Sequence, residues 1–178
     1  MRVRDHIAFS TATAAIARPW LGRDAIWLWA GGVLIDADHY AWFCLSQRRV
    51  NPRSAVQFFN GAHAPQHPAT RALHDPRVLL GAVLLGPWHR CLMPLAIGMS
   101  LHVALDRRHE ARLDRARALA LKRDDHACRA CGTRAFVGTH LWRQPWLLPS
   151  YRVDGLVSLC GPCHELAHEG STGEVLWS

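Results

Sequence analysis

CRACG, residues 128–132, and LCGPCHELAH, residues 159–168, decide the fold of the C-terminal part of this 178-residue chain. Together they hold two Cys-x-x-Cys pairs, made by Cys128, Cys131, Cys160 and Cys163. Two such pairs place four thiolates around one ion in a closed tetrahedral site, which is typical of structural zinc. A segment of about 50 residues buries too little apolar surface to fold alone. We therefore expect Zn²⁺ to supply much of its folding free energy.

A secreted disulfide scaffold is the alternative interpretation of these cysteines. Residues 1–20 do not resemble a secretory signal, because Asp5 and His6 interrupt the apolar run and no clean cleavage site follows. Reduced thiolates that hold a metal fit better, so we expect the protein in the cytoplasm or at the cytoplasmic face of a membrane. Two further cysteines, Cys44 and Cys91, lie in apolar runs and are expected to be buried.

Composition points to a folded protein with anionic partners. Lys and Arg number 21 against 14 Asp and Glu, which gives a net charge of +7 and favours nucleic acid or an acidic membrane surface. A hydrophobic content of 49% excludes a disordered chain. The run RRHEARLDRARALALKR, residues 107–123, predicts a basic helix that links a domain at 1–106 to one at 124–178.

The first 106 residues are apolar and rich in tryptophan, and they predict a bundle of four or five helices. The expected helices span 5–17, 24–46, 78–88 and 91–105. The first should end before Pro19, since proline disfavours helical geometry in the preceding residue. A loop rich in Pro, His and Asn is expected over 50–69. With short strands and a brief helix after residue 124, the fold class is mainly α.

Whether the helical part enters a membrane stays open at this point. The stretch at 25–45 has 21 residues, enough to cross a bilayer, but Asp36, Asp38 and His39 lie within it. The run at 78–88 is too short to span a bilayer alone. Arginine occurs in nearly every connection, so no topology follows from charge. Membrane embedding or attachment and a buried helical core are both compatible with this pattern.

Three histidines accompany the cysteine pairs. His140 lies in AFVGTHLW, which predicts a strand that ends in a turn. His164 and His168 are four residues apart in the expected C-terminal helix, so their side chains share one face. This spacing suits a second, open metal site beside the zinc. The alternative is that these imidazoles only form local hydrogen bonds.

CRACG, GTHLW, V-x-x-LVSLC and CHELAH together resemble the zinc-knuckle class of HNH endonucleases over about residues 124–170. The resemblance implies a small ββα-metal zinc-knuckle module in which His140 is the general base that activates water for attack on a phosphodiester. It also implies that His164 and His168 hold the catalytic divalent cation, Mg²⁺ or another. Where the family has a further metal ligand and a central Asn, this chain has Thr139 and Gly155.

The function implied by that resemblance is metal-dependent hydrolysis of nucleic acid. The basic residues expected to contact phosphates are Arg129, Arg134 and Arg143, together with the helix at 107–123. Trp142 and Trp146 are candidates either for stacking on bases or for a small core. The alternative from another class is a catalytically degraded, zinc-stabilised protein that binds nucleic acid or acts as a scaffold.

The N-terminal part carries its own set of polar residues. The candidate ligands are His6, Asp36, Asp38, His39, His102 and Asp106, and a His-rich loop adds His63, His67 and His74. Unpaired charge within an apolar helix is costly, and carboxylates and imidazoles that project from several helices form metal cages in helical bundles. The alternative is that each histidine lies at a helix end or surface, with Asp36 or Asp38 as an internal cap.

The early His6, the segment GGVLIDADH at 31–39, the His-rich loop and the late pair of His102 and Asp106 resemble the inner-membrane metal-dependent hydrolase family. The proline that precedes the first Asp in that family is Ile35 here. The resemblance implies a metal-binding helical domain, associated with a membrane, and a third interpretation in which hydrolysis takes place in this half. The sequence indicates neither the substrate nor the oligomeric state.

Overall fold

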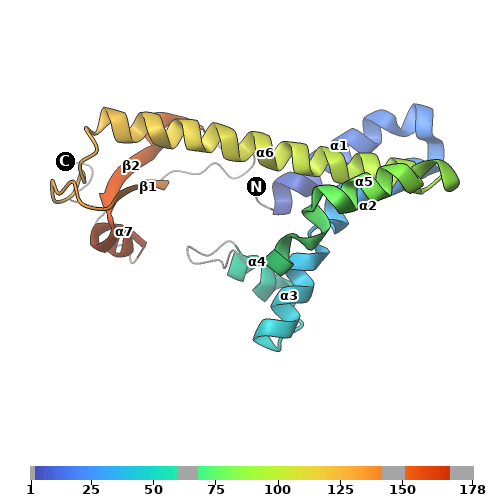
Figure 1. Cartoon of the computed structure of the whole chain (residues 1–178), viewed down its shortest axis with the longest axis horizontal. Coiled ribbons are helices and arrows are strands. Elements are labelled where there is room, and N and C mark those ends of the chain that lie inside the picture. Colours follow the sequence, from blue (N-terminus) through green and yellow to red (C-terminus); the bar gives the residue numbers. More distant parts are fainter. Residues whose placement is uncertain (1–2, 60–67, 142–150, 169–178) are drawn as a thin grey trace. The chain divides into compact units, whose positions relative to one another are not determined.

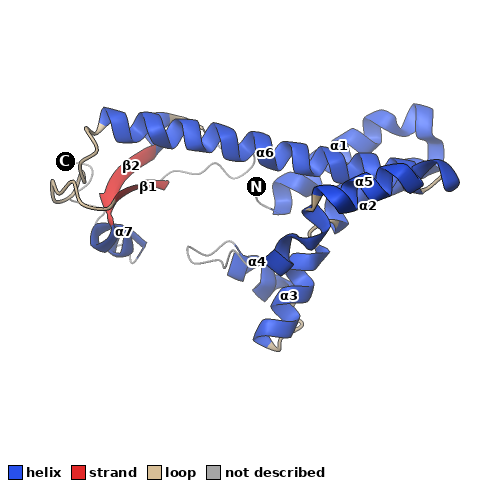
Figure 2. Ribbon diagram, viewed as in Figure 1, coloured by secondary structure: helices blue, strands red, loops and turns tan. Residues whose placement is uncertain are grey.

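The computed structural model describes residues 3–59, 68–141 and 151–168. Helices make up the N-terminal part, and a two-stranded antiparallel sheet followed by a helix lies near the C-terminus (Figure 2). This confirms the mainly α fold class, with a multi-helix N-terminal part before a small ββα module. The chain divides into two compact units, unit 1 at Met1–Arg107 and unit 2 at Arg108–Ser178.

Unit 1 is built from α-helices and short 3₁₀ helices. Its elements are α1 (Val3–Leu21), α2 (Ala25–Leu34), α3 (Ala37–Gln47), α4 (Pro52–Phe59), α5 (Pro76–Leu85) and the first half of α6 (Leu92–Arg123) (Figure 1). Short 3₁₀ helices span Gly22–Asp24, Pro68–His74 and Gly86–Trp88. The Asp75 carboxylate caps α5 by accepting a 2.7 Å hydrogen bond from the Arg77 amide.

The predicted helix over 24–46 is wrong in one respect, because the structure divides it into α2 and α3 at Ile35 and Asp36. Asp36 is the N-cap residue of α3, and its carbonyl accepts a 3.1 Å hydrogen bond from the His39 amide. Ile35 is thus the C-cap of α2, and Asp36 is the N-cap of α3.

Three other boundaries differ from the prediction. Helix α1 continues through Pro19, whose fixed φ is close to the helical value and which removes only one hydrogen bond from the last turn. The expected loop at 50–69 contains α4, which Asn51 caps by accepting a 2.9 Å hydrogen bond from the Arg53 amide. Instead of separate helices at 91–105 and 107–123, α6 runs without interruption, because nothing after Pro94 breaks it.

Helices α2 and α6 meet through glycines. A Cβ atom added to Gly98 would lie 2.1 Å from the Leu28 carbonyl oxygen, and one added to Gly31 would lie 2.1 Å from the Leu95 carbonyl oxygen. Only glycine permits backbones to come this close. Buried Ile35, Met99 and Val103 pack beside this crossing. The contact fixes the part of α6 that carries His102.

Unit 2 consists of the second half of α6, a two-stranded sheet and a helix. Strand β1 (Val137–Leu141) pairs antiparallel with β2 (Leu156–Cys160), with Val137 opposite Cys160 and His140 opposite Val157. A 3₁₀ helix at Val153–Gly155 precedes β2, and α7 (Gly161–His168) follows it. Every residue of β2 is buried. The predicted order of strand, strand and helix is therefore present.

Asp124 joins the end of α6 to β2. Its carboxylate accepts two hydrogen bonds from the Arg123 guanidinium, at 2.8 and 2.7 Å, and one of 3.2 Å from the Ser158 amide. The same guanidinium donates to the carbonyls of Val153 and Leu156. Burial favours the neutral acid, but the hydrogen bonds from Arg123 and Ser158 outweigh it and lower the pKa of Asp124. This residue pair anchors the sheet to the helix.

Within the described ranges, none of the helices combines the length and apolar character needed to cross a bilayer.

Candidate metal centres

The four cysteines of the two Cys-x-x-Cys pairs meet at one point of unit 2. Their sulfur atoms all lie within 4.8 Å of one another, and none forms a disulfide. The Sγ atoms of Cys131 and Cys160 are 3.6 Å apart. Tetrahedral bonds of about 2.3 Å to Zn²⁺ place neighbouring sulfur atoms about 3.8 Å apart. The spacing of the thiols therefore fits a single closed metal site.

The first Cys-x-x-Cys pair, Cys128 and Cys131, forms a turn that we call the first knuckle, and backbone hydrogen bonds hold its shape. The Cys128 amide donates a 2.8 Å hydrogen bond to the Thr133 carbonyl, and the Gly132 amide donates one of 2.8 Å to the Cys128 carbonyl. Gly132 adopts a φ of +76°, which suits glycine. Burial raises the pKa of Cys128, but hydrogen bonds from backbone amides, that of Cys160 first, outweigh it and lower the pKa to about 6. Such a pKa favours the thiolate that a metal requires.

The three histidines of unit 2 form a second cluster. His140 on β1 faces His164 and His168 on α7, with ring centroids 4.9 and 4.7 Å from that of His140. One ring nitrogen from each lies within 4.8 Å of the others. Burial, and then the charges of the two helix histidines, lower the pKa of His140. Thr139 lies on the opposite face of β1 because side chains alternate along a strand.

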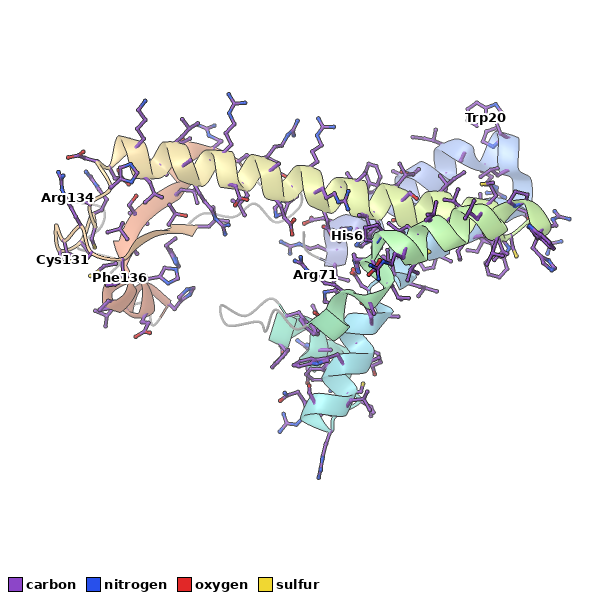
Figure 3. The ribbon with its side chains drawn as sticks, in the orientation of Figure 1. His6, Trp20, Arg71, Cys131, Arg134 and Phe136 are labelled. Atoms are coloured by element: carbon purple, nitrogen blue, oxygen red, sulfur yellow. The ribbon has the colours of Figure 1, made fainter. Side chains whose placement is uncertain are left out.

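The expected phosphate contacts are placed only in part. Arg129 and Arg134 are exposed beside the first knuckle, and Arg134 forms an ion pair with Asp125. Arg143, Trp142 and Trp146 fall outside the described residues. Phe136, which the sequence analysis did not single out, is 97% exposed and has a φ of +50°. Figure 3 shows its ring near Cys131 and Arg134 at the same end of unit 2.

Unit 1 brings a separate set of polar side chains together, which we call the unit 1 cluster. Its members are His6 from α1, Asp36, Asp38 and His39 from the start of α3, His74 from the 3₁₀ helix, and His102 and Asp106 from α6. All six candidate ligands named from the sequence are present in it. Of the three loop histidines, His74 also belongs to the cluster, and His63 and His67 fall outside the described residues.

One side of the unit 1 cluster is formed by His6, His102 and Asp106. The His6 Nε2 atom lies 3.1 Å from Asp106 Oδ1, and His102 Nε2 lies 3.3 Å from Asp106 Oδ2. The rings of His6 and His102 stack with their centroids 3.8 Å apart. His102 Nδ1 lies 2.8 Å from the Gly32 carbonyl oxygen, to which it donates. That bond directs the other ring nitrogen into the cluster, as in many metal-binding histidines.

The other side is formed by His39, His74 and Asp38. Asp38 Oδ1 lies 2.8 Å from His39 Nδ1, and Asp38 Oδ2 accepts a 2.9 Å hydrogen bond from the Leu73 amide. Asp36 lies between the two sides. Its Oδ1 atom is 3.3 Å from His74 Nε2, 3.4 Å from His102 Nε2 and 3.8 Å from His39 Nδ1.

Electrostatics in the cluster reflect these contacts. Burial alone would lower the pKa values of His74 and His102, but hydrogen bonds to the carboxylates raise them to about 9 and about 10. Burial alone would raise the pKa values of Asp36 and Asp106, but bonds to the same histidines lower them well below the usual range. The four groups therefore form compensating charge pairs when no metal is bound.

Comparison of the chain with protein-family models, with curated proteins and with solved structures found no match. The three clusters of the described residues are therefore the features from which a function can be inferred.

Proposed function

We propose that unit 2 is a metal-dependent nuclease of the HNH type, which hydrolyses phosphodiester bonds in nucleic acid. The observation that carries the proposal is the convergence of His140 from β1 with His164 and His168 from α7, beside four clustered cysteines. The order of two antiparallel strands and a helix supports it. In this proposal Zn²⁺ in the cysteine site stabilises the module and takes no part in the reaction.

Each histidine has a distinct task. His164 and His168 hold a divalent cation, which polarises the scissile phosphate and stabilises the leaving oxygen. His140 accepts a proton from water while the water oxygen forms a bond to phosphorus and the bond to the leaving oxygen breaks. The imidazoles of His164 and His168 suit a transition metal such as Zn²⁺ or Ni²⁺ better than Mg²⁺.

The surroundings of the site suit a polyanion. Exposed Arg129 and Arg134 flank the first knuckle, and exposed basic residues of α6 continue into unit 2. Lysine and arginine contacts to phosphates supply affinity without sequence preference. The exposed ring of Phe136 adds a surface on which an unpaired base can stack. We therefore propose nucleic acid as the substrate, bound mainly through its backbone.

The test is cleavage of plasmid and single-stranded DNA by the full chain, with Mg²⁺, Mn²⁺, Ni²⁺ or Zn²⁺ supplied in turn. His140→Ala should reduce cleavage by about 10²- to 10⁴-fold, the usual contribution of a general base, while zinc in the cysteine site is retained. His168→Ala should raise the cation concentration required. His89→Ala, at an exposed position in unit 1, is the control.

Cleavage that persists undiminished in His140→Ala would refute the assignment. Binding of DNA without cleavage under every cation would instead support the alternative of a zinc-stabilised nucleic-acid-binding protein.

A further inference from the structure

We infer that the unit 1 cluster is a dinuclear metal centre in which the Asp36 carboxylate bridges two divalent cations. The inference concerns unit 1 alone, so it is independent of the nuclease proposed for unit 2.

The distances within the cluster are those of a metal site. Bonds of about 2.1 Å to nitrogen and oxygen separate neighbouring ligand atoms by about 3.0 Å in octahedral and about 3.4 Å in tetrahedral geometry. The contacts of His6 and His102 with Asp106, and of His74 and His102 with Asp36, all measure 3.1 to 3.4 Å. These ligand atoms are therefore already spaced for coordination.

The number of donors points to two ions. Six histidine and aspartate side chains form three overlapping groups whose ligand atoms lie within 4.8 Å of one another, and with both oxygens of each carboxylate they offer eight donor atoms. One octahedral ion accepts six donor atoms at most. Asp36 Oδ1 lies 3.4 Å from His102 Nε2 on one side of the cluster, and 3.3 and 3.8 Å from His74 Nε2 and His39 Nδ1 on the other. A carboxylate in that position can bind one ion on each side, and paired ions lie about 3.5–4 Å apart.

A cluster of ion pairs without metal explains the geometry less well. The Nε2 atoms of His74 and His102 are 3.3 Å apart, so at most one proton can lie between them. Two metal-bound nitrogens can approach this closely because neither carries a hydrogen. The buried Nδ1 atom of His6 has no hydrogen-bond partner among the described residues. Its Nε2 atom is the one that faces Asp106.

Partial exposure indicates a reactive centre. The side chains of His6 and His102 are 4% and 0% exposed, whereas those of Asp36 and Asp106 are 23% and 25% exposed. The cluster is thus closed around His6 and His102 and open to solvent at Asp36 and Asp106. Mixed imidazole and carboxylate ligands suit Mn²⁺, Fe²⁺ or Zn²⁺. Such an ion pair activates water for hydrolysis of a phosphoester or a similar bond.

The test uses the full chain with His164→Ala and His168→Ala, which removes the open site of unit 2 and leaves the cysteines. After loading with Mn²⁺, electron paramagnetic resonance should show an exchange-coupled pair with about two Mn²⁺ per chain, because a bridging carboxylate couples neighbouring ions. Elemental analysis after zinc loading should give two zinc ions beyond the one in the cysteine site.

Asp36→Asn should abolish the coupling and weaken retention of the second ion at least tenfold. Asp114→Asn, an exposed aspartate of α6, is the matched control and should leave both unchanged. The unsubstituted cluster tests the inference even if Asp36→Asn fails to fold. A single uncoupled Mn²⁺ would overturn the bridge, and no metal beyond the cysteine zinc would identify the cluster as a core of ion pairs.

Discussion

Gly98→Ala is the substitution that most directly tests how the fold of unit 1 builds its cluster. The added Cβ would lie 2.1 Å from the Leu28 carbonyl oxygen and 2.9 Å from the Gly32 amide nitrogen. Ordinary contact begins at 3.4 Å, so α2 and α6 must separate by roughly 1 Å. Alanine favours the helix by about 1 kcal/mol, whereas overpacking of this kind costs about 1–3 kcal/mol. We expect a net loss of stability of up to about 2 kcal/mol.

The displacement should weaken metal binding more than it weakens the fold. It lengthens the 2.8 Å bond from His102 to the Gly32 carbonyl and the 3.4 Å separation of His102 from Asp36. Loss of such an orienting bond typically lowers metal affinity about 10- to 100-fold. Thermal unfolding followed by circular dichroism gives the stability, and a competition titration with a zinc chelator gives the affinity.

Gly81→Ala is the matched control for that experiment. Gly81 lies inside α5, and a Cβ at this position would meet nothing within 4 Å. The control should therefore gain up to about 1 kcal/mol from helix propensity and keep its metal. If Gly98→Ala behaves like Gly81→Ala in both measurements, the close glycine contact does not position the cluster.

Cys163→Ser should abolish zinc retention and unfold unit 2, because it opens the closed site. Elemental analysis and near-ultraviolet circular dichroism measure the two effects, and Cys91→Ser is the control that should show neither. Full zinc retention in Cys163→Ser would contradict the four-cysteine site. Asp124→Ala should cost about 1–3 kcal/mol in denaturant unfolding because it leaves buried donors unpaired. Asp114→Ala should lower the free energy of unfolding by at most about 1 kcal/mol, since its ion pair is exposed. Equal losses of stability in the two variants would show that Asp124 does not anchor the sheet to α6. Phe136→Ala should weaken binding of single-stranded DNA by about 1–3 kcal/mol in a fluorescence-anisotropy titration, with unchanged zinc content; unchanged affinity would exclude stacking.

The C-terminal module could be predicted from sequence because its information is local. Each Cys-x-x-Cys pair fixes two ligands within one turn, and the four-residue spacing of His164 and His168 places them on one helix face. The strand that carries His140 could be predicted from the alternation of side chains along it and from the turn residues beside it. The exposure of Phe136 could not be predicted, because a single aromatic residue before a strand is usually part of a core.

The N-terminal elements show where local signals fail. The break at Ile35 and Asp36 has no Gly or Pro, so a continuous apolar run predicted one helix. The one indication in the sequence was that unpaired carboxylates in an apolar interior are costly. In the structure, contacts between these carboxylates and imidazoles from other helices offset that cost. The sequence predicted two helices where α6 is one, because its first half is apolar and its second half is basic. Both halves nevertheless share the same helical backbone geometry.

His74 illustrates the limit most clearly. The sequence places it in a His-rich loop, with no spacing that separates it from His63 or His67. Its position in the structure depends on Asp38, whose Oδ2 accepts a hydrogen bond from the Leu73 amide and so holds the end of the 3₁₀ helix against α3. A carboxylate far earlier in the chain thereby holds this imidazole in the cluster. Contacts of this range depend on tertiary packing, which no local pattern encodes.

The ligand types of the clusters suit different roles, one in stabilising the fold and the others in reactions. Four thiolates use every position of a tetrahedral ion, so the cysteine site can stabilise unit 2 but cannot bind a substrate. His164 and His168 leave positions free on any ion they bind, and so do the partly exposed carboxylates of Asp36 and Asp106 in unit 1. Imidazole and carboxylate ligands also exchange their ion more readily than a closed thiolate cage. On the proposals made above for the two units, the structural metal would be chemically separate from the positions at which water would be activated.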